Sequence, residues 1–474
     1  MCSSDLLGDV TSFGGAGKIT RLGQDQEVRE PGDVHGKCLL CIIVSAIGIG
    51  HAVRSANSTK PSQTWQDKAD GARQEENEAR RPAGAFFTPP ASFMVCHVTD
   101  GRMRTSQAKR LQLTIKSARV TAYSAPYDEP ITNGLYTYTH TEIVVVELEL
   151  ASGVTGVGWT HGGRIVYEAA KEVAQVVIGQ PLNTERIWKM IYRPKIFGRR
   201  GLATRAISAV DIAVWDAIGK ETGRSVHQLL GGCRDQVPAY VAGGYYGKGK
   251  GLDGLQKEVS TKVSTGAKAI KMKIGAVPIA EDIARVDAVI EAVGPGVDVL
   301  VDANNAYSRL DALKMARLLE ERSIFWFEEP LSPEDNAGAA ELVQRTDVPI
   351  ALGENEYTIT GFRELITARA ADVLNADAQI LGGITEWQKC AHYADANHIP
   401  VAPHGDQEIH VHLVAAVPNG LVVEFYDNSL NTLKDAMFKQ QLELNADGSI
   451  TVPNRPGLGF DLNHAALEKF RVQD

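Results

Sequence analysis

The sequence predicts an α/β fold in which a parallel (β/α)-barrel follows a smaller α+β domain. Seven short apolar segments between residues 269 and 424 each carry an ionisable residue at or near their C-terminal end, and they recur about every 25 residues. This interval is the length of one strand and one helix. Apolar strands without polar alternation are typical of a parallel sheet that helices cover on both faces. A long series of such units closes most naturally into a barrel, in which the C-terminal ends of all strands meet at one mouth.

Residues 1–110 are predicted to be disordered. Gly, Ser, Arg, Glu and Gln dominate them, and a composition so poor in large apolar residues cannot offset its ordering entropy. The apolar run at 38–50 is too short for a membrane span and too far from the start for an ordinary secretion signal. A transit sequence, a family-specific appendage and a mis-predicted gene start remain open for this segment. Cys38 and Cys41 form a CxxC motif without a second pair nearby, which disfavours a zinc or redox site.

A capping domain of the α+β class is predicted over residues 111–235. Alternating apolar residues predict antiparallel strands at 111–123, 141–150 and 153–159. Apolar residues at three- and four-residue spacing predict helices at 167–178, 183–192 and 202–221. Gly223 suits the left-handed conformation that ends a helix. The segment 126–139 is rich in Tyr, Asp, Asn and Gly, and we interpret it as a loop.

The catalytic barrel is predicted over residues 236–440. Its strands are expected at 237–243, 269–275, 299–304, 325–330, 350–355, 373–377, 399–404 and 421–424. Helices between them are expected at 279–293, 309–322 and 333–346, among others. Residues 441–474 contain a turn, a short strand and a closing helix near 463–470. We expect this C-terminal segment to pack back on the capping domain.

The overall composition disfavours several classes of partner. A net charge of −9 and a pI of about 5.8 argue against binding to nucleic acid or to an anionic membrane. An anionic substrate is not excluded, because a bound divalent cation can invert the local field. The six cysteines are too scattered for a disulfide framework, so a reducing compartment and a cytoplasmic location are expected.

Asp302, Glu328 and Glu354 end three consecutive predicted strands. Three carboxylates that converge without compensation repel one another strongly, and one hard divalent cation relieves this repulsion. Ligation by oxygen alone, with room for water and substrate oxygens, suits Mg²⁺. Glu329 and Asn304 are candidates for groups that orient these ligands.

Two further pairs of side chains are candidates for acid–base chemistry. Lys271 and Lys273 lie two residues apart on one strand, so both project to the same side, and close ammonium groups lower each other's pKa. Asp377 and His404 end the two predicted strands that follow the strand of Glu354. A carboxylate bonded to one ring nitrogen fixes the tautomer and leaves the other nitrogen free to take a proton. Glu424 ends the following strand, where it can hydrogen-bond a substrate carboxyl group.

Together these motifs resemble the mandelate racemase-like group of the enolase superfamily over about residues 112–472. The matching motifs are Lys271-Met-Lys273, Asp302, Glu328-Glu-Pro, Gly-Glu354-Asn, Asp377 with Gly382-Gly383, and Pro403-His404. The resemblance implies an enolase-type barrel with a capping domain and a Mg²⁺ ion held by Asp302, Glu328 and Glu354. It also implies that the segment 126–139 caps the barrel and helps to select the substrate, and that the protein is a homo-oligomer.

The resemblance assigns roles to the remaining site residues as well. Lys273 is the implied base on one face of the substrate, with Lys271 as its electrostatic neighbour. His404 with Asp377 is the implied acid or base on the other face, and Glu424 lies beside the substrate carboxylate. Many relatives carry Lys or Arg three residues after the sixth-strand Asp, where this chain has Ile380. This difference favours His404 as the group on the second face.

The expected reaction begins with abstraction of a proton α to a carboxylate. Mg²⁺, Lys271 and a hydrogen bond from protonated Glu424 would stabilise the growing negative charge. Loss of a β-hydroxyl protonated by His404 would give a 2-keto-3-deoxy acid. The mouth is rich in polar residues, namely Asn304, Asn305, Gln379, Asp406 and Gln407. We therefore expect a hydro-lyase that acts on an acid sugar, an aldonate or aldarate.

Other functions are open at this point. A cycloisomerase of a sugar lactone or anhydro-sugar acid needs the same two faces, and so does a racemase or epimerase of a 2-hydroxy acid. A non-catalytic barrel that works through residues 1–110 is disfavoured, because every candidate base and metal ligand is intact.

Overall fold

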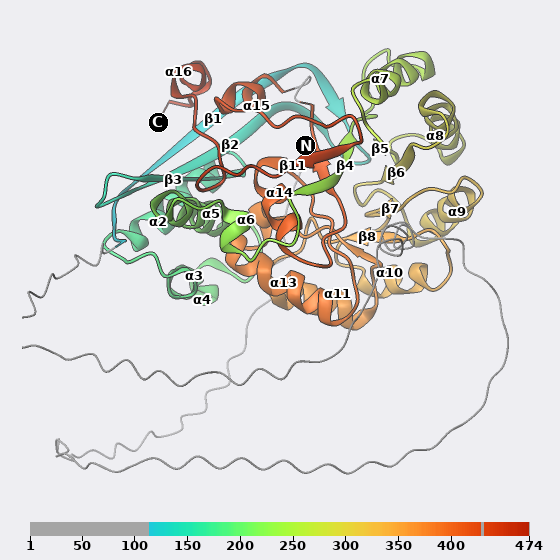
Figure 1. Cartoon of the computed structure of the whole chain (residues 1–474). Coiled ribbons are helices and arrows are strands. Elements are labelled where there is room, and N and C mark those ends of the chain that lie inside the picture. Colours follow the sequence, from blue (N-terminus) through green and yellow to red (C-terminus); the bar gives the residue numbers. More distant parts are fainter. Residues whose placement is uncertain (1–112, 428–430, 474) are drawn as a thin grey trace, which may run out of the picture. The chain divides into compact units, whose positions relative to one another are not determined.

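The computed structural model describes residues 113–427 and 431–473, which form a capping domain and a barrel domain (Figure 1). The predicted α/β fold is confirmed: a three-stranded antiparallel sheet precedes a sheet of parallel strands that helices surround. The N-terminal segment 1–110, with its apolar run and CxxC motif, lies outside the described residues. No helix in the described part of the chain is long and apolar enough to span a membrane.

The capping domain is built on a sheet with the order β1-β2-β3. Its strands are β1 (Ile115–Thr132), β2 (Thr137–Leu150) and β3 (Thr155–His161). Its helices are α2 (Arg164–Val177), α3 (Thr184–Ile191), α4 (Pro194–Phe197), α5 (Leu202–Thr222) and α6 (Val226–Leu229). Gly156 and Gly158 let α5 lie directly on β3, because a Cβ at either position would fall within 2.2 Å of a carbonyl oxygen of α5. As predicted, Gly223 ends α5 in the left-handed conformation, with φ 67°.

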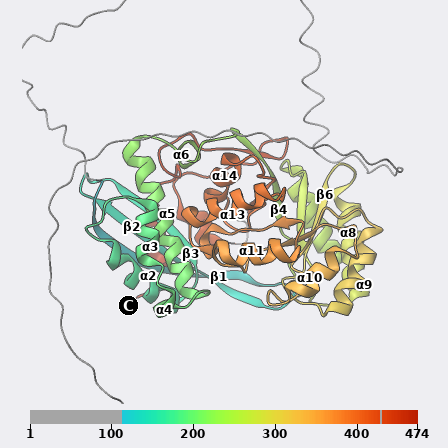
Figure 2. The ribbon, with the colours of Figure 1, turned by 90° about the horizontal axis from the view of Figure 1, so that it is seen from below.

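The prediction of a loop over residues 126–139 is wrong. Strands β1 and β2 continue through most of this segment, and only residues 133–136 connect them. The side chains here are largely exposed on both faces, so the alternation that marks a half-buried strand is missing from the sequence. We call residues 126–139 the capping hairpin. Figure 2 shows β1, which forms one side of it, running from the capping domain along the barrel.

The barrel strands follow the order β10-β4-β5-β6-β7-β8-β9. They are β4 (Gln236–Ala242), β5 (Ala269–Lys273), β6 (Asp298–Asp302), β7 (Phe327–Glu328), β8 (Ile350–Leu352), β9 (Val373–Leu374) and β10 (Val423–Phe425). The strand predicted at 399–404 is reduced to single parallel pairings of Val401 with Leu374 and Gly420, which close the ring between β9 and β10. Pro400 and Pro403 lack the backbone N–H that a longer ladder needs.

Helices cover the outside of this ring (Figure 1). They are α7 (Leu252–Ser264), α8 (Ile279–Val293), α9 (Arg309–Glu320), α10 (Asn336–Val343), α11 (Thr358–Ala368), α12 (Ala378–Leu381), α13 (Ile384–Ala396) and α14 (Gln407–Ala416). The predicted helix at 279–293 agrees with α8 at both ends. The helices predicted at 309–322 and 333–346 are shorter in the structure.

The C-terminal segment contacts both domains and not the capping domain alone. Its elements are β11 (Ser449–Thr451), α16 (His464–Leu467) and a short 3-10 helix (Glu468–Phe470), and α15 (Thr432–Met437) precedes it. Strand β11 pairs antiparallel with β4 of the barrel. Arg471 pairs instead with Tyr123 on β1 of the capping domain.

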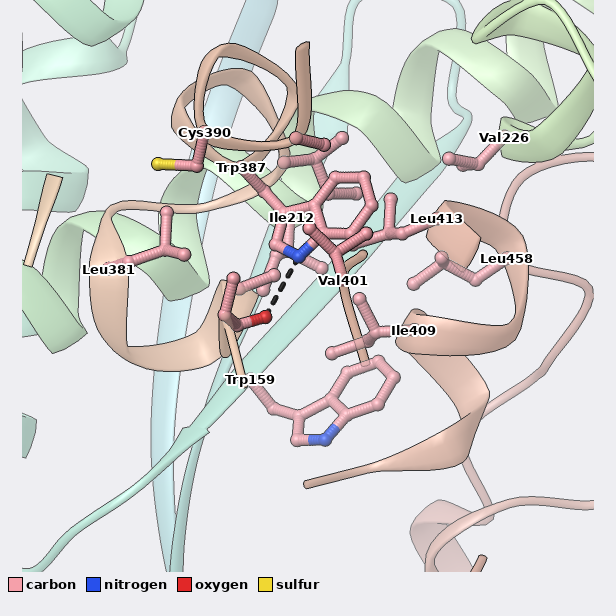
Figure 3. Packing of buried hydrophobic residues seen from close by; sticks show 14 of the residues in the cluster. Trp159, Ile212, Val226, Leu381, Trp387, Cys390, Val401, Ile409, Leu413 and Leu458 are labelled. Atoms are coloured by element: carbon pink, nitrogen blue, oxygen red, sulfur yellow. Dashed lines mark hydrogen bonds between the residues drawn. The ribbon is translucent and has the colours of Figure 1, made fainter. Parts of the chain in front are cut away.

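The two domains share one hydrophobic core (Figure 3). Trp159 and Ile212 of the capping domain lie in the same cluster as Trp387, Val401 and Ile409 of the barrel. Each of these side chains is at most 1% exposed. Removal of apolar surface from water therefore joins the domains as well as stabilising each of them.

A polar contact lies beside this core. Asp211 on α5 accepts hydrogen bonds from Thr385 N at 2.9 Å and from Thr385 Oγ1 at 2.6 Å. Trp215 Nε1 donates to the same Oγ1 at 2.9 Å. Gly383, with φ +91°, lies so close that a Cβ would fall 2.4 Å from Asp211 Oδ2. The Gly382-Gly383 pair of the sequence motif is thus required where α5 meets the barrel.

Asp211 makes the stability of this contact depend on pH. Burial raises the pKa of its carboxyl group to about 7. The folded protein then holds the proton more tightly than the unfolded chain, whose Asp has a pKa near ~3.9, so stability falls as pH rises through this window. Between pH 5 and 7, we expect the unfolding free energy of wild type to fall relative to that of Asp211→Asn by about 1.4 kcal/mol per pH unit. The variant lacks the titrating carboxyl group.

Denaturant or thermal unfolding at a series of pH values measures this difference. Asp253→Asn, at an exposed position on α7, is the matched control and should follow the wild-type profile. Parallel profiles for wild type and Asp211→Asn would contradict the assignment.

Candidate active site

The ends of the parallel strands bring the predicted carboxylates together. Asp302 ends β6, Glu328 ends β7, and Glu354 follows β8. Oxygen atoms of the three side chains lie within 4.8 Å of one another. Asp302 and Glu328 are fully buried, and Glu354 is 9% exposed. The register of the sheet places Asp302 directly beside Glu328, so the convergence follows from the strand pairing.

This carboxylate group has the chemistry of a site for a hard divalent cation. Burial and the charges of Asp302 and Glu354 together outweigh the opposing effect of Lys271 and raise the pKa of Glu328 to about 8. The Oε2 atom of Glu354 is buried and accepts no hydrogen bond within the described residues. Oxygen ligands, excess negative charge and an unpaired acceptor all fit Mg²⁺.

Lys271 and Lys273 project from β5 toward these carboxylates. Lys271 Nζ lies 2.9 Å from Glu328 Oε1 and 2.8 Å from Glu424 Oε1, and Lys273 Nζ lies 2.5 Å from Asp302 Oδ2. The charge of Lys271 lowers the pKa of Lys273, as the sequence predicts, but the expected net lowering of the lysine pKa values is wrong. Burial lowers the pKa of both lysines, but the adjoining carboxylates outweigh burial and raise it. Each ammonium group is held by a carboxylate in direct contact.

His404 lies on the other side of the carboxylate group. Its Nδ1 is 3.0 Å from Asp377 Oδ2, and its Nε2 is 3.7 Å from Glu354 Oε2. Asp377 also accepts a hydrogen bond from Gln379 N at 2.7 Å, which fixes the carboxylate. Burial lowers the pKa of His404, but Glu354 and Asp377 raise it to about 10. These carboxylates favour the protonated imidazole, and its Nε2 faces Glu354.

Glu424 is ionised, and this differs from the prediction of a protonated hydrogen-bond donor. Burial raises its pKa, but Lys271 and His404 outweigh burial and hold the pKa at about 2. The carboxylate contacts Lys271, and its Oε2 accepts a hydrogen bond from Gly405 N at 2.8 Å. Glu424 thus joins the lysine side of the site to the turn that follows His404.

Two family models match the chain. The model described as mandelate racemase / muconate lactonizing enzyme, N-terminal domain, matches residues 115–231. The model described as enolase C-terminal domain-like matches residues 254–466. The chain belongs to the mandelate racemase / muconate lactonizing enzyme family. The predicted resemblance to the enolase superfamily is confirmed.

Several similar proteins are named for reactions on sugar acids. Arabinonate dehydratase of Saccharolobus solfataricus is 37% identical over 70% of this chain and 91% of its own length. The 3,6-anhydro-alpha-L-galactonate cycloisomerase of Streptomyces coelicolor is 32% identical over 76% of this chain and 99% of its own. A crystal structure of L-talarate dehydratase from Polaromonas, complexed with Mg and L-glucarate, has a TM-score of 0.70 and 34% identity, covering 76% of this chain and 98% of that one.

The sequence predicts that Asp406 lies among the polar residues of the barrel mouth, but the structure places it in a buried ion-pair and hydrogen-bond network. It is buried, and it accepts a hydrogen bond from Trp159 Nε1 at 2.5 Å and pairs with Lys434 Nζ at 2.6 Å. His161 Nε2 lies 3.3 Å from its other oxygen. The side chain of Gln407 donates to Tyr426 O at 3.1 Å. Asp406 therefore ties β3 and α15 to the barrel, and no local sequence pattern indicates that Trp159 is a partner.

The capping hairpin reaches the barrel mouth, as the family resemblance implied. A Cβ on Gly134 at its tip would fall 2.2 Å from Ala303 O, so the tip rests on the backbone that follows Asp302. Burial raises the pKa of Tyr138 on the same hairpin, while the charge of Lys273 lowers it and that of Glu354 raises it. These interactions place the Tyr138 hydroxyl among the charges of the site.

The fit to Mg²⁺ has a consequence for stability that does not depend on turnover. A cation that binds only the folded protein stabilises it, by about 2.7 kcal/mol at 100 times the dissociation constant. We expect Mg²⁺ to raise the thermal midpoint of wild type and to have little effect on Glu354→Gln. Differential scanning calorimetry with and without Mg²⁺ measures both.

Glu356→Gln is the matched control for this experiment. Glu356 is similarly buried, at 7% exposed, but lies outside the three-carboxylate group. It should keep the full Mg²⁺ effect. An equal shift for wild type and Glu354→Gln would show that the ion binds elsewhere.

Proposed function

We propose that the protein is a Mg²⁺-dependent dehydratase of an acid sugar, an aldonate or aldarate. The observation that supports this most strongly is the placement of two ionisable groups on either side of one carboxylate group. Lys273 contacts Asp302 at 2.5 Å, and His404 contacts Glu354 at 3.7 Å. A substrate whose carboxylate lies at the metal site would have one of these groups on each face.

The site residues would hold the ion and the substrate in a defined geometry. Asp302, Glu328 and Glu354 would ligate Mg²⁺, which when bound supplies electrophilic stabilisation of the substrate carboxylate. Lys271 is held between two carboxylates and keeps its positive charge. It is placed to stabilise negative charge that develops at the substrate, without reorganisation during the reaction.

Proton transfer would occur at two atoms of the chain. Lys273 Nζ would take the proton α to the carboxylate in its amine form, which becomes accessible when a bound cation offsets the Asp302 charge that raises the pKa of this lysine. His404 Nε2 donates a proton to the β-hydroxyl, which leaves as water while its C–O bond breaks. The electron pair of the broken C–H bond forms the C=C bond of an enol, and this enol tautomerises to the 2-keto-3-deoxy acid. Asp377 holds Nδ1 of the imidazole so that Nε2 faces the substrate.

The names of the relatives support an acid sugar as substrate. A dehydratase and a cycloisomerase are both among the similar proteins. Both reactions use a base on one face and an acid on the other, and they differ in the group that leaves. If the leaving group is a ring oxygen and not a hydroxyl group, the same residues would catalyse a cycloisomerase reaction.

A substrate panel tests the reaction class. We expect wild type with Mg²⁺ to convert one or more aldonates or aldarates to 2-keto acids, detected as semicarbazones by absorbance. Ring opening of a lactone or anhydro-sugar acid without a keto product from any open-chain acid would favour the cycloisomerase. Exchange of the α proton without either product would favour a racemase.

Two substitutions separate the roles of the two faces. Lys273→Ala should reduce turnover by at least about 100-fold because no other group replaces the base. His404→Asn should stop dehydration and retain exchange of the α proton with D₂O, followed by NMR. Lys257→Ala and His398→Asn are matched controls at exposed positions, and Asn suits the φ of 58° at residue 398. Wild-type rates in Lys273→Ala or His404→Asn would refute the assigned roles.

A further inference from the structure

Arg285 on α8 lies behind the strand that carries Lys273. Its Nη1 donates to Lys273 O at 2.8 Å, and its Nη2 donates to Gly244 O at 2.8 Å. The side chain is only 12% exposed. Because a guanidinium group presents its donors in one rigid plane, these two bonds set the end of β5 at a fixed position relative to the end of β4.

The guanidinium group is itself held on two sides. Its carbon lies 3.7 Å from the ring centre of Tyr246, and Nη1 lies 3.3 Å from Asp282 Oδ1. Asp282 is fully buried and also accepts hydrogen bonds from the Tyr246 hydroxyl, from Tyr307 Oη at 3.2 Å and from Gly275 N at 2.8 Å. Asp282 therefore fixes both Arg285 and the backbone two residues beyond Lys273.

The capping hairpin contacts this cluster at two points. Thr132 N donates to Tyr246 O at 3.0 Å, and Tyr246 N donates to Thr132 O at 2.9 Å. At the hairpin tip, the Cα of Gly134 is 3.4 Å from the position that a Cβ on Gly275 would take. Tyr246 and Gly275 are the two residues that link the hairpin to the Arg285–Asp282 pair.

We infer that Arg285 is a positioning residue that couples docking of the capping hairpin to the placement of Lys273. The hairpin pairs with the backbone of Tyr246, whose ring and hydroxyl hold Arg285 and Asp282. Arg285 in turn holds the carbonyl group of Lys273. A hairpin that is seated on the mouth thus favours the backbone geometry in which Lys273 Nζ faces the site. This inference rests on the proposed role of Lys273 as the base.

Arg285→Lys is the most direct test, because it keeps the charge and removes the two-pronged donor. A displacement of a reacting group by about 1 Å can cost on the order of 100-fold in rate. We expect kcat to fall by about 10- to 100-fold with KM changed by less than about threefold. A substrate deuterated at the α carbon should show a larger isotope effect on kcat than with wild type, because proton abstraction becomes rate-limiting.

Tyr307→Phe is the matched control. It removes one hydrogen bond to Asp282 Oδ2 and leaves in place the contacts that Arg285 and Tyr246 make with Oδ1. It should keep the wild-type kcat and isotope effect. If Arg285→Lys does not fold, Tyr246→Phe, which removes the hydroxyl that donates to Asp282 Oδ1 and accepts from Ala276 N, should show the same changes in smaller degree.

A double-substitution cycle tests the link to the hairpin. Gly134→Ala should lift the tip from Ala303 O and lower kcat. Combined with Arg285→Lys, its effect on kcat should be smaller than in wild type, because the two changes break one connection. Independent, multiplying effects would overturn the coupling.

Three further results distinguish a positioning role of Arg285, a role in stability alone and a failure of the proposed function. An unchanged kcat and isotope effect in Arg285→Lys, with wild type active, would overturn the inference while leaving the proposed function intact. Equal losses in Arg285→Lys and Tyr307→Phe, accompanied by a lower thermal midpoint, would show that the cluster serves stability alone. Absence of any product from wild type with the substrate panel would instead refute the proposed function.

Discussion

Repulsion among three buried carboxylates is the interaction that organises this site. Asp302, Glu328 and Glu354 bring oxygen atoms within 4.8 Å of one another in an interior where charge is poorly solvated. The lysines of β5 compensate on one side, and His404 compensates on the other. The same charge balance that lets these groups be buried places a candidate base and a candidate acid against the metal position. The same charge compensation at the strand ends is therefore required for burial of these groups and for their proposed chemistry.

The positions of the site residues were largely predictable, whereas their protonation states were not. Parallel strands in a barrel direct their C-terminal ends to one mouth, so sequence spacing alone brings Asp302 and Glu354 together. The pKa directions of Lys273 and Glu424 depend on contacts across the barrel, which spacing does not reveal. Partners such as Asp406 and Trp159, which are far apart in the chain, leave no local pattern either.

The fold itself shows the same division between local and long-range information. Helix α8 begins and ends where its periodicity predicts, because one apolar face packs on the strands. The capping hairpin was missed, since it forms strands without burying a continuous face. The strand around Val401 was predicted too long, because the prolines on either side limit its pairing. Local apolar patterns thus indicate which residues are buried. They do not predict strands that are held by backbone pairing alone.

The shared core of the two domains bears on how such enzymes can diversify. Trp159 and Ile212 are packed among barrel residues, and Gly383 admits α5 at backbone distance. Exchange of a whole capping domain would have to reproduce this shared packing and the close approach at Gly383 in the new host. The capping hairpin, in contrast, meets the barrel through the backbone pairing of Thr132 with Tyr246 and through its tip at Gly134. An exchange of residues 126–139 would therefore leave the shared core of the two domains intact, because no residue of that cluster lies in this segment.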